Sequence, residues 1–381
     1  MIPFNKPYIT GKEVHYLYQA VYSGHISGNG VYTNKCQHFF EERWGFKKTL
    51  LTTSCTDALE MCALLLDIKP GDEVIVPSYT FVSTALAFVR QGAKIVFADS
   101  RTDHPGIDED KIEDLITPKT KVIVPVHYAG VACDMDKIMD IAKRHNLFVV
   151  EDAAQAIDSY YTGKDGIKRA LGTIGHLSTF SFHETKNIQC GEGGLLGIND
   201  KRFVERAEVI WEKGTNRAEF FRGEVDKYGW VDTGSSFLPS EITAAFLWAQ
   251  LENSDIIQAK RKGIWNQYYD GLKPLESLGF FQLPEVPNYA TKNAHMFYII
   301  VSSLEERSNL IRFLKEKGFY TVFHYQSLHR SDYYKSIYHG NLLNNSDTYT
   351  DCLLRLPMYY ELGDKQINEL VSELNMFYLN K

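Results

Sequence analysis

Two side chains in the sequence, Lys186 and Asp152, could together carry out amine chemistry. Lys186 ends residues 181–186 (Ser-Phe-His-Glu-Thr-Lys) and lies just before the glycine-rich residues 191–194. A lysine at such a junction can lose water around its amine, which lowers the pKa and makes the amine a nucleophile. Asp152 follows the apolar residues 147–150. A lysine for a Schiff base and an aspartate for a pyridinium nitrogen are the two groups that pyridoxal phosphate (PLP) requires of a protein.

The start of an expected helix at residues 56–66 offers a place for a phosphate group. The apolar residues there have the i, i+3, i+4, i+7 spacing of an amphipathic helix, namely Leu59, Cys62, Ala63 and Leu66. A helix N-terminus has unpaired amides and the positive end of the helix dipole, so residues 54–57 suit a phosphate. Ser181, five residues before Lys186, could add a hydroxyl to the same group.

Other side chains could contact a bound pyridine ring. Gln155 could hydrogen-bond the ring hydroxyl, and Phe81 or Tyr79 could stack on the ring face. Each residue also has an ordinary structural interpretation: alone, Asp152 would be a helix cap and Lys186 a surface lysine. The chemical interpretation gains weight because the segments that carry these residues end strands in the correct order.

Strand-like and helix-like segments alternate through the first half of the chain. Strands are expected at 73–77, 94–98, 121–126 and 147–150, and helices at 56–66, 81–91, 109–116 and 134–143. Two more strands, 179–182 and 194–198, are joined through Lys186. Such alternation predicts an α/β fold with βαβ crossovers and a mostly parallel sheet. Because ligands bind at the carboxyl ends of these strands, residues 54–57, Asp152 and Lys186 are expected to converge.

The last third of the chain predicts a second, smaller unit. A long helical stretch begins at residues 240–251 and runs towards Leu272, as a bridge out of the first unit. After it, strands are expected at 297–301 and 320–324, and helices at 304–317 and 364–378. We therefore expect a large domain over residues 1–252 and a small α+β C-terminal domain over residues 253–381.

Composition and charge argue against several classes of protein. The chain has 381 residues, is 44% hydrophobic as in a globular protein, and has no apolar run long enough to span a membrane. Its six scattered cysteines form no Cys-x-x-Cys pair, and its first residues lack the pattern of a signal peptide. No disulfide framework or metal site is predicted. The net charge of −7 disfavours nucleic-acid binding. No Gly-x-Gly-x-x-Gly follows the first expected strand of this chain, which argues against a dinucleotide-binding dehydrogenase. We expect a cytoplasmic protein without membrane or nucleic-acid partners.

Several segments resemble the DegT/DnrJ/EryC1/StrS family of sugar aminotransferases. They are residues 181–187 with 191–194, residues 151–155 (Glu-Asp-Ala-Ala-Gln) and residues 77–84 (Pro-Ser-Tyr-Thr-Phe-Val-Ser-Thr). The resemblance covers essentially the whole chain and implies a fold type I PLP enzyme, similar to aspartate aminotransferase. It also implies a homodimer with shared active sites and L-glutamate as the amino donor. By the same resemblance, Lys186 forms the Schiff base with PLP and Asp152 holds the pyridine nitrogen. The other implied cofactor contacts are Cys55, Thr56, Phe81, Gln155 and Ser181.

One segment departs from the family pattern. Most members carry Gly-x-Asn-x-Arg, whose asparagine reaches the phosphate in the neighbouring subunit. Here residues 234–238 read Gly-Ser-Ser-Phe-Leu, so Ser236 replaces the asparagine and Leu238 the arginine. Together with residues 213–217, 221–223 and 225–228, this variant resembles the subgroup that forms dTDP-4-amino-4,6-dideoxygalactose (dTDP-fucosamine) for enterobacterial common antigen. The diphosphate of a nucleotide sugar needs cationic or amide donors, and we expect Arg217, Arg222 and Lys227 to supply them, although each could equally be a solvated surface charge. His183 and His329 are the expected contacts to the sugar.

The expected reaction moves an amino group from L-glutamate to C4 of the nucleotide sugar dTDP-4-keto-6-deoxy-D-glucose. Its product would enter a surface polysaccharide such as the O-antigen of lipopolysaccharide. An equatorial amine at C4 (the viosamine-forming enzyme), amination at C3, and uracil in place of thymine remain alternatives. A sugar 3-dehydrase is disfavoured because that subgroup has histidine at the place of Lys186. A PLP-binding regulator without turnover is the non-enzymatic alternative.

Overall fold

The computed structural model describes residues 1–379, and its largest element is a seven-stranded sheet. In order across the sheet, the strands are β1 (Lys48–Thr52), β9 (Gly194–Ile198), β8 (Leu177–Ser181), β5 (Phe148–Asp152), β4 (Thr120–Ile123), β2 (Glu73–Pro77) and β3 (Lys94–Ala98). Neighbouring strands from β8 to β3 are parallel, whereas β9 runs antiparallel to both β1 and β8. The predicted α/β fold with a mostly parallel sheet is confirmed.

Helices cover both faces of this sheet because its strands are apolar on both sides. Successive side chains of a strand point to opposite faces, and Leu50 and Leu51 of β1 accordingly enter different core clusters. One face packs against α3 (Cys55–Leu65), α4 (Ser83–Val89) and α6 (Val204–Trp211). The other face packs against α2 (Val31–Trp44), α5 (Met135–Arg144) and α8 (Glu241–Leu251), and α1 (Glu13–Tyr22) lies on α8.

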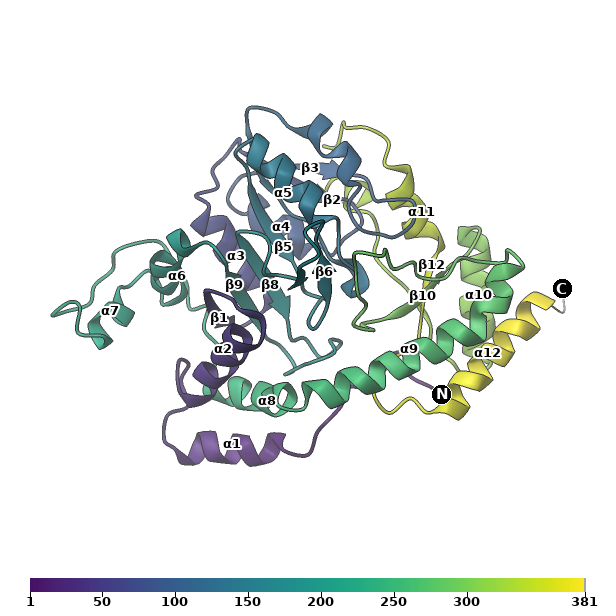
Figure 1. Ribbon diagram of the computed structural model, residues 1–381, viewed down its shortest axis with the longest axis horizontal. Coiled ribbons are helices and arrows are strands. Elements are labelled where there is room, and N and C mark those ends of the chain that lie inside the picture. Colours follow the sequence, from purple (N-terminus) through teal and green to yellow (C-terminus); the bar gives the residue numbers. More distant parts are fainter. Residues whose placement is uncertain (380–381) are drawn as a thin grey trace.

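A second, three-stranded antiparallel sheet lies towards the other end of the molecule (Figure 1). Its strands, in order, are β10 (Phe297–Ile300), β12 (Leu353–Leu356) and β11 (Val322–Phe323). Its helices are α9 (Ser254–Ser277), α10 (Leu304–Glu316), α11 (Asn344–Cys352) and α12 (Asp364–Leu379). On α9, Ile257 packs into the core of the large sheet and Trp265 into that of the small sheet. We therefore propose a domain division near residue 252; residues 380 and 381 of the predicted small domain lie outside the described residues.

The first residues of the chain are attached to segments that follow α10 and β12, beside the small sheet, rather than to the large sheet. The amide of Ile2 donates to the carbonyl of Gly318 (2.7 Å), and the amide of Met358 donates to the carbonyl of Phe4 (3.1 Å). These bonds bring Phe4 and its neighbour Asn5 to the space between the two sheets.

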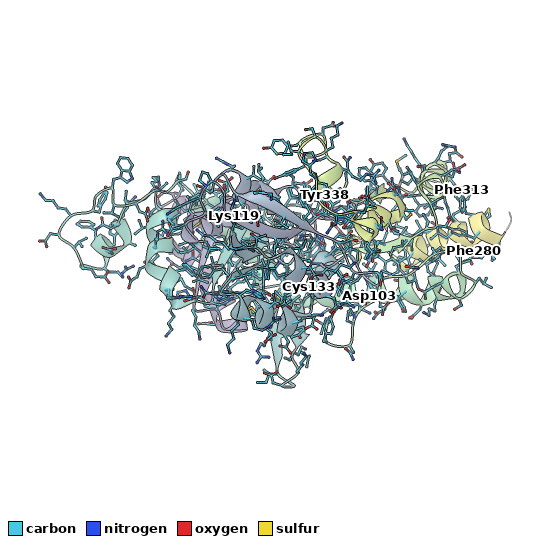
Figure 2. The ribbon with its side chains drawn as sticks, turned by 90° about the horizontal axis from the view of Figure 1, so that it is seen from above. Asp103, Lys119, Cys133, Phe280, Phe313 and Tyr338 are labelled. Atoms are coloured by element: carbon cyan, nitrogen blue, oxygen red, sulfur yellow. The ribbon has the colours of Figure 1, made fainter. Side chains whose placement is uncertain are left out.

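A segment between α6 and α8 projects away from the body of the molecule, at the left of Figures 1 and 2. It carries the short helix α7 (Arg217–Phe221) and the exposed aromatic side chains of Phe221 and Trp230. A small hairpin of β6 (Tyr160–Thr162) and β7 (Lys168–Ala170) lies apart from both sheets. Among the helices of residues 1–379, none is both long enough and apolar enough to cross a membrane.

Two expected elements are wrong. The helix expected at 109–116 is a pair of short 3₁₀ turns, Glu109–Lys111 and Glu113–Leu115. The Glu109 carboxylate is buried there and accepts hydrogen bonds from Arg101 and from the amide of Asp134, tertiary contacts that override the helical pattern. The strand expected at 320–324 is reduced to β11, because the backbone at Tyr325 takes a positive φ of 53° and turns the chain into a pocket.

Candidate active site

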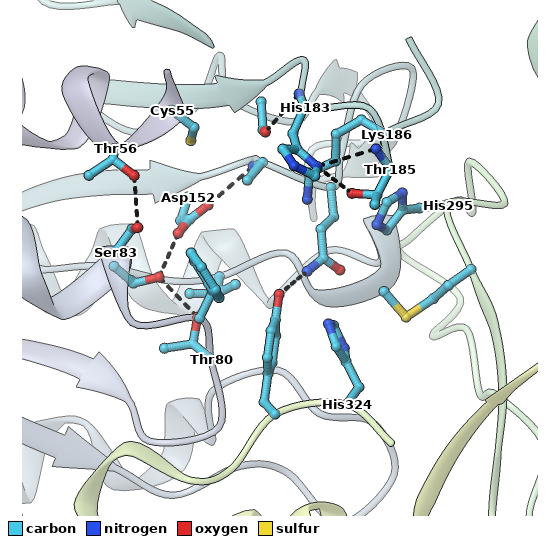
Figure 3. Close-up of a pocket in the computed structure, with 18 of the residues that line it drawn as sticks. Cys55, Thr56, Thr80, Ser83, Asp152, His183, Thr185, Lys186, His295 and His324 are labelled. Atoms are coloured by element: carbon cyan, nitrogen blue, oxygen red, sulfur yellow. Dashed lines mark hydrogen bonds between the residues drawn. The ribbon is translucent and has the colours of Figure 1, made fainter. Parts of the chain in front are cut away.

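A cavity of about 520 Å³ lies where the strand ends of the large sheet face the small sheet. This volume is within the usual range for small-molecule and cofactor sites. Figure 3 shows that Cys55, Asp152, Lys186, His295 and His324 surround the same space, although they come from distant parts of the chain. The sequence-predicted residues that line the cavity are Cys55, Thr56, Phe81, Asp152, Gln155, Ser181, His183 and Lys186.

Asp152 is the last residue of β5 and lies buried at the floor of the pocket. One carboxylate oxygen accepts a hydrogen bond from the Thr84 hydroxyl (2.7 Å), and the other accepts from the amide of Ala154 (3.1 Å). Thr84 is itself bonded to the Thr80 hydroxyl (2.9 Å). Burial raises the pKa of Asp152, since its charged form has lost water. A cationic ring nitrogen placed beside this carboxylate would compensate that loss, which fits the group that PLP presents.

Lys186 lies in the turn between β8 and β9, with its backbone amide bonded to the carbonyl of His183 (2.9 Å). The side chain is half-buried in the pocket wall. Within residues 1–379, its amine has no hydrogen bond and no ion pair. Burial lowers the pKa of this amine, and the nearby guanidinium of Arg355 lowers it further. An unpaired amine with a lowered pKa is the state that a lysine nucleophile needs.

The N-terminus of α3 forms another wall of the pocket. Ser54 caps the helix by accepting from the amide of Asp57 (3.1 Å). The backbone amides of Cys55 and Thr56 have no acceptor among the described residues, and the Thr56 hydroxyl lies 2.8 Å from that of Ser83. Two free amides at the positive end of a helix suit a phosphate dianion.

Gly194, the first residue of β9, permits this helix start to lie close to the sheet. A Cβ at Gly194 would lie 2.4 Å from the backbone of Ser54 and Cys55, closer than atoms can approach. Gly194→Ala is therefore expected to displace the α3 N-terminus, lower stability by about 1–3 kcal/mol and weaken PLP binding. Thermal unfolding and PLP titration measure the two effects. Gly263→Ala is the control, because the exposed Gly263 lies in the middle of α9 with open space around its Cα. Equal PLP affinity of the Gly194 variant and the control would contradict this role of Gly194.

The remaining predicted cofactor contacts, Gln155, Phe81 and Ser181, are present at the pocket, and the polar atoms of Gln155 already have protein partners. The side-chain oxygen of Gln155 accepts from the amide of Ala129 (2.7 Å), and its nitrogen donates to the Tyr325 hydroxyl (3.2 Å). Phe81 is 55% exposed and its ring centroid lies 6.0 Å from that of Tyr325, so one face of the ring is free for a ligand. Ser181 ends β8, at the same sheet edge as Asp152.

Five other predicted contacts lie outside the pocket of this chain. Ser236, Arg217, Arg222 and Lys227 belong to the projecting segment, and His329 lies near the end of β2. Arg222 pairs with the carboxylates of Glu208 and Glu224, and His329 bonds the Ser78 hydroxyl through Nδ1 (2.7 Å). The roles of these residues remain predictions. Ser236 in particular is predicted to act across a subunit interface, which a single chain does not contain.

Several pocket residues were missed by the sequence analysis. They are Phe4 and Asn5 near the N-terminus, Thr80 and Thr84 on the α4 side, and His295, His324, Tyr325 and Arg355 from the small unit. One signal was available for Arg355: it is the only charged residue in Leu-Leu-Arg-Leu (353–356), where an apolar strand is otherwise expected. A second signal was the i, i+4 pair Thr80 and Thr84, which places two hydroxyls on one side of a helical turn.

The fold and this site define a class of protein, and comparison with known proteins agrees with it. The model of the DegT/DnrJ/EryC1/StrS aminotransferase family matches residues 7–375, and the chain belongs to this family of PLP-dependent sugar aminotransferases. The MJ1066 protein of Methanocaldococcus jannaschii is 30% identical over 379 residues, 97% of this chain and 96% of that protein.

Solved structures with the same fold agree with the family assignment. The aminotransferase TlmJ from Streptoalloteichus hindustanus superposes on this chain with a TM-score of 0.89 and 26% sequence identity, and the match covers 100% of both chains. The putative sugar aminotransferase Spr1654 from Streptococcus pneumoniae in its PMP form has a TM-score of 0.88 and 26% identity over 98% of both chains; the same protein is known in a PLP form. The fold type I architecture expected from the resemblance is thereby confirmed.

Proposed function

We propose that this protein transfers the amino group of L-glutamate to C4 of dTDP-4-keto-6-deoxy-D-glucose, with PLP as cofactor. The observation that carries the proposal is the unpaired amine of Lys186 in the same pocket as the buried, oriented carboxylate of Asp152. The sugar and its nucleotide are proposed from the resemblance of residues 234–238 to the dTDP-fucosamine-forming subgroup.

Each pocket residue has a distinct task in this proposal. The amides of Cys55 and Thr56 bind the cofactor phosphate, and Asp152, oriented by Thr84, keeps the ring nitrogen protonated. PLP, when bound, supplies an electron sink for the carbanion formed at the substrate carbon. Lys186 Nζ in its neutral form accepts the α-proton of the amino donor and later returns a proton to the sugar carbon that receives the amine.

The identity of the product tests the proposed reaction. The purified protein with PLP, L-glutamate and dTDP-4-keto-6-deoxy-D-glucose is expected to give 2-oxoglutarate and a dTDP-4-amino-4,6-dideoxyhexose. Proton couplings at C4 in the NMR spectrum distinguish the axial amine of the fucosamine product from the equatorial amine of viosamine. Transamination places the amine at the carbonyl carbon, so an amine formed only from the isomeric dTDP-3-keto-6-deoxy sugar would assign the protein to the 3-aminotransferases. No 2-oxoglutarate with any keto sugar would favour a PLP-binding regulator.

The segment between α6 and α8 is the part of the chain through which we expect two subunits to associate. We propose a homodimer in which the projecting segment, with Ser236, Arg217, Arg222 and Lys227, reaches the active site of the second subunit. Two observations support this: the segment leaves the body of its own chain, and it exposes apolar side chains such as Phe221 and Trp230. Sedimentation of the purified protein tests it, and a monomer at enzyme-assay concentration would contradict it.

The environment of Lys186 predicts how pH affects its reaction with PLP. Its pKa is lowered by burial and by Arg355, so the neutral, reactive amine predominates at lower pH than for an exposed lysine, whose pKa is about 10.4. The rate at which the cofactor-free protein develops its visible absorption band is therefore expected to rise with pH and to level off at a lower pH than for an exposed lysine. Nα-acetyl-lysine mixed with PLP provides the exposed-amine control. Parallel pH profiles for the protein and the free amine would contradict the prediction.

A further inference from the structure

His295 is a buried pocket residue for which the proposed reaction has no task so far. It stands two residues before β10, lines the same cavity as Lys186, and lies on the same side of that cavity in Figure 3. Its ring nitrogen Nδ1 is 2.9 Å from Oδ1 of Asn187, and Asn187 directly follows Lys186 in the chain. One hydrogen bond therefore ties this imidazole to the neighbour of the lysine that carries the chemistry.

The hydrogen bonds of Asn187 determine which nitrogen of His295 carries the proton. The side-chain nitrogen of Asn187 donates to the backbone carbonyl of Asn293 (2.8 Å) and to Oε1 of Gln258 on α9 (2.8 Å). Because a carbonyl only accepts, the nitrogen of this amide must face Asn293, and its oxygen must face His295. The Nδ1 of His295 therefore carries a hydrogen and donates it to Asn187. In the neutral ring, Nε2 is then an acceptor.

The surroundings of His295 keep its ring neutral. Burial lowers the pKa of His295 well below its usual value, and the neighbouring cations Lys186, Arg261 and Arg355 lower it further. Arg261 is fixed in place, since it donates to the carbonyls of Ala294 (3.0 Å) and His295 (2.6 Å). No anion is among the charged groups that act on this ring. Its Nε2 therefore keeps a lone pair at physiological pH.

The Nε2 atom of His295 needs a hydrogen donor, and Lys186 is the one that is always present. Within residues 1–379, Nε2 has no hydrogen-bond partner. The cofactor phosphate and the carboxylates of glutamate offer only acceptors at pH 7. Sugar hydroxyls are donors, but the sugar is bound during only one half of the reaction. The amine of Lys186 has no partner of its own, and its flexible side chain can turn toward His295 without a change of backbone.

We propose that His295 is a positioning residue for Lys186, whose protonated amine donates a hydrogen bond to His295 Nε2. This inference rests on the proposed function and names the group that holds the lysine between the two proton transfers. Lys186 becomes an ammonium when it takes the α-proton of glutamate, whereas burial and Arg355 disfavour that charge. An acceptor at Nε2 stabilises the ammonium, because hydrogen bonds to charged groups are the strong ones. It also fixes the direction in which the amine points.

The other titratable groups around Lys186 do not provide this acceptor. Asp152 of β5 already accepts two hydrogen bonds, and Arg355 of β12 is a cation. Burial raises the pKa of the Cys55 thiol on α3, so it stays protonated. The Nδ1 of His324, which follows β11, faces a tyrosine hydroxyl that can donate or accept, so no partner fixes which nitrogen of that ring is the acceptor.

Two substitutions of His295 separate the acceptor from the ring. His295→Asn keeps an amide near the position of Nδ1, so it can still donate to Asn187, but it has no atom at the position of Nε2. His295→Gln is longer and places an amide oxygen near that position. Both are compared with His38→Asn, a substitution of an exposed histidine on α2, which should behave as the wild type does.

The first measurement uses the cofactor-free protein and the rate at which its visible band develops with PLP. The rate at each pH is expressed as a fraction of its plateau at high pH. Below the plateau, this fraction is expected to be about 10-fold higher in His295→Asn than in the wild type, because the ammonium has lost its acceptor and the neutral amine predominates at lower pH. His295→Gln should stay close to the wild type.

The second measurement uses the PLP-loaded protein and α-deuterated glutamate. In His295→Asn the single-turnover rate is expected to fall about 10-fold while the Kd for PLP stays unchanged. The deuterium isotope effect should increase, because removal of the α-proton by a poorly held lysine becomes more nearly rate-limiting. A purely structural role of His295 would instead change the Kd for PLP.

Each outcome separates this inference from the proposed function. A pH profile of His295→Asn that matches the wild type, or equal changes in the Asn and Gln variants, would overturn the role of His295 while the aminotransferase reaction stands. A wild-type profile combined with weaker binding of the keto sugar would assign Nε2 to the sugar and overturn it too. A wild-type protein that forms no 2-oxoglutarate from glutamate would overturn the proposed function instead.

If His295→Asn fails to fold, the wild-type protein decides. In protein labelled with ¹⁵N at histidine, NMR distinguishes a ring that carries its hydrogen on Nδ1 from one that carries it on Nε2. The signal of His295 is identified by its loss in His295→Gln. A hydrogen on Nδ1 supports the inference, and a hydrogen on Nε2 overturns it.

Discussion

Replacing Lys186 by alanine is expected to abolish both the visible absorption band of the PLP-loaded protein and amino transfer. The variant loses the only amine among the pocket residues that could bond PLP, and it loses the base that moves the α-proton. We expect the transfer rate to fall by about 10⁴-fold or more. Absorption spectra and formation of 2-oxoglutarate from glutamate measure the two losses.

The control for this variant is Lys201→Ala. Lys201 is an exposed lysine that follows the C-terminal end of β9, whereas the turn with Lys186 precedes the N-terminal end of that strand. It should keep the band and the activity of the wild type. Unfolding temperatures verify that both variants are folded. A Lys186→Ala protein with an unchanged visible spectrum would remove the basis of the proposed function.

Asp152→Asn is expected to slow the reaction with glutamate by about 10²- to 10³-fold while the visible band persists. The asparagine keeps the shape of the aspartate and can still accept from the amide of Ala154, but it cannot hold a protonated ring nitrogen. Single-turnover absorption changes after mixing with glutamate measure the rate. Because asparagine preserves the shape of the pocket, the expected loss of rate is caused by the missing negative charge and not by a change in the fold.

A second variant tests how the carboxylate is oriented. Thr84→Val removes the hydroxyl that bonds Asp152 and should cause a smaller loss of rate in the same direction. A PLP analogue methylated at the ring nitrogen carries a permanent positive charge, so it should restore part of the rate lost in Asp152→Asn. An Asp152→Asn protein as fast as the wild type would contradict the assignment of Asp152.

The chemistry-bearing part of the site was predictable because it is local in the sequence. Lys186, Asp152 and the start of α3 each follow a strand, and the carboxyl ends of neighbouring parallel strands lie side by side whatever the detailed packing is. In the structure these segments line one pocket, as expected. The antiparallel direction of β9 does not disturb this, since Lys186 precedes β9 in the connecting turn.

The position of the other half of the pocket could not be predicted from local pattern, even where a single residue such as Arg355 is unusual in its strand. Arg355, His324 and Phe4 reach the pocket only because the small sheet is placed against the large one, a tertiary fact with no periodic signal. The prediction of a helix at 109–116 failed for the same reason, because the hydrogen bonds of Glu109 to Arg101 and Asp134 are tertiary contacts that the local pattern does not contain. Likewise β11 is short because residues after Phe323 leave the sheet for the pocket.

The attachment of the N-terminal residues beside the small sheet has a consequence for how the protein matures in the cell. The pocket wall extends in sequence from Phe4 to Met358, so a chain emerging from the ribosome has no complete site until Met358 has been made. Capture of the vitamin-derived cofactor is therefore expected to follow translation. Because a ligand stabilises only the finished form, the supply of that vitamin should govern how many newly made molecules escape degradation.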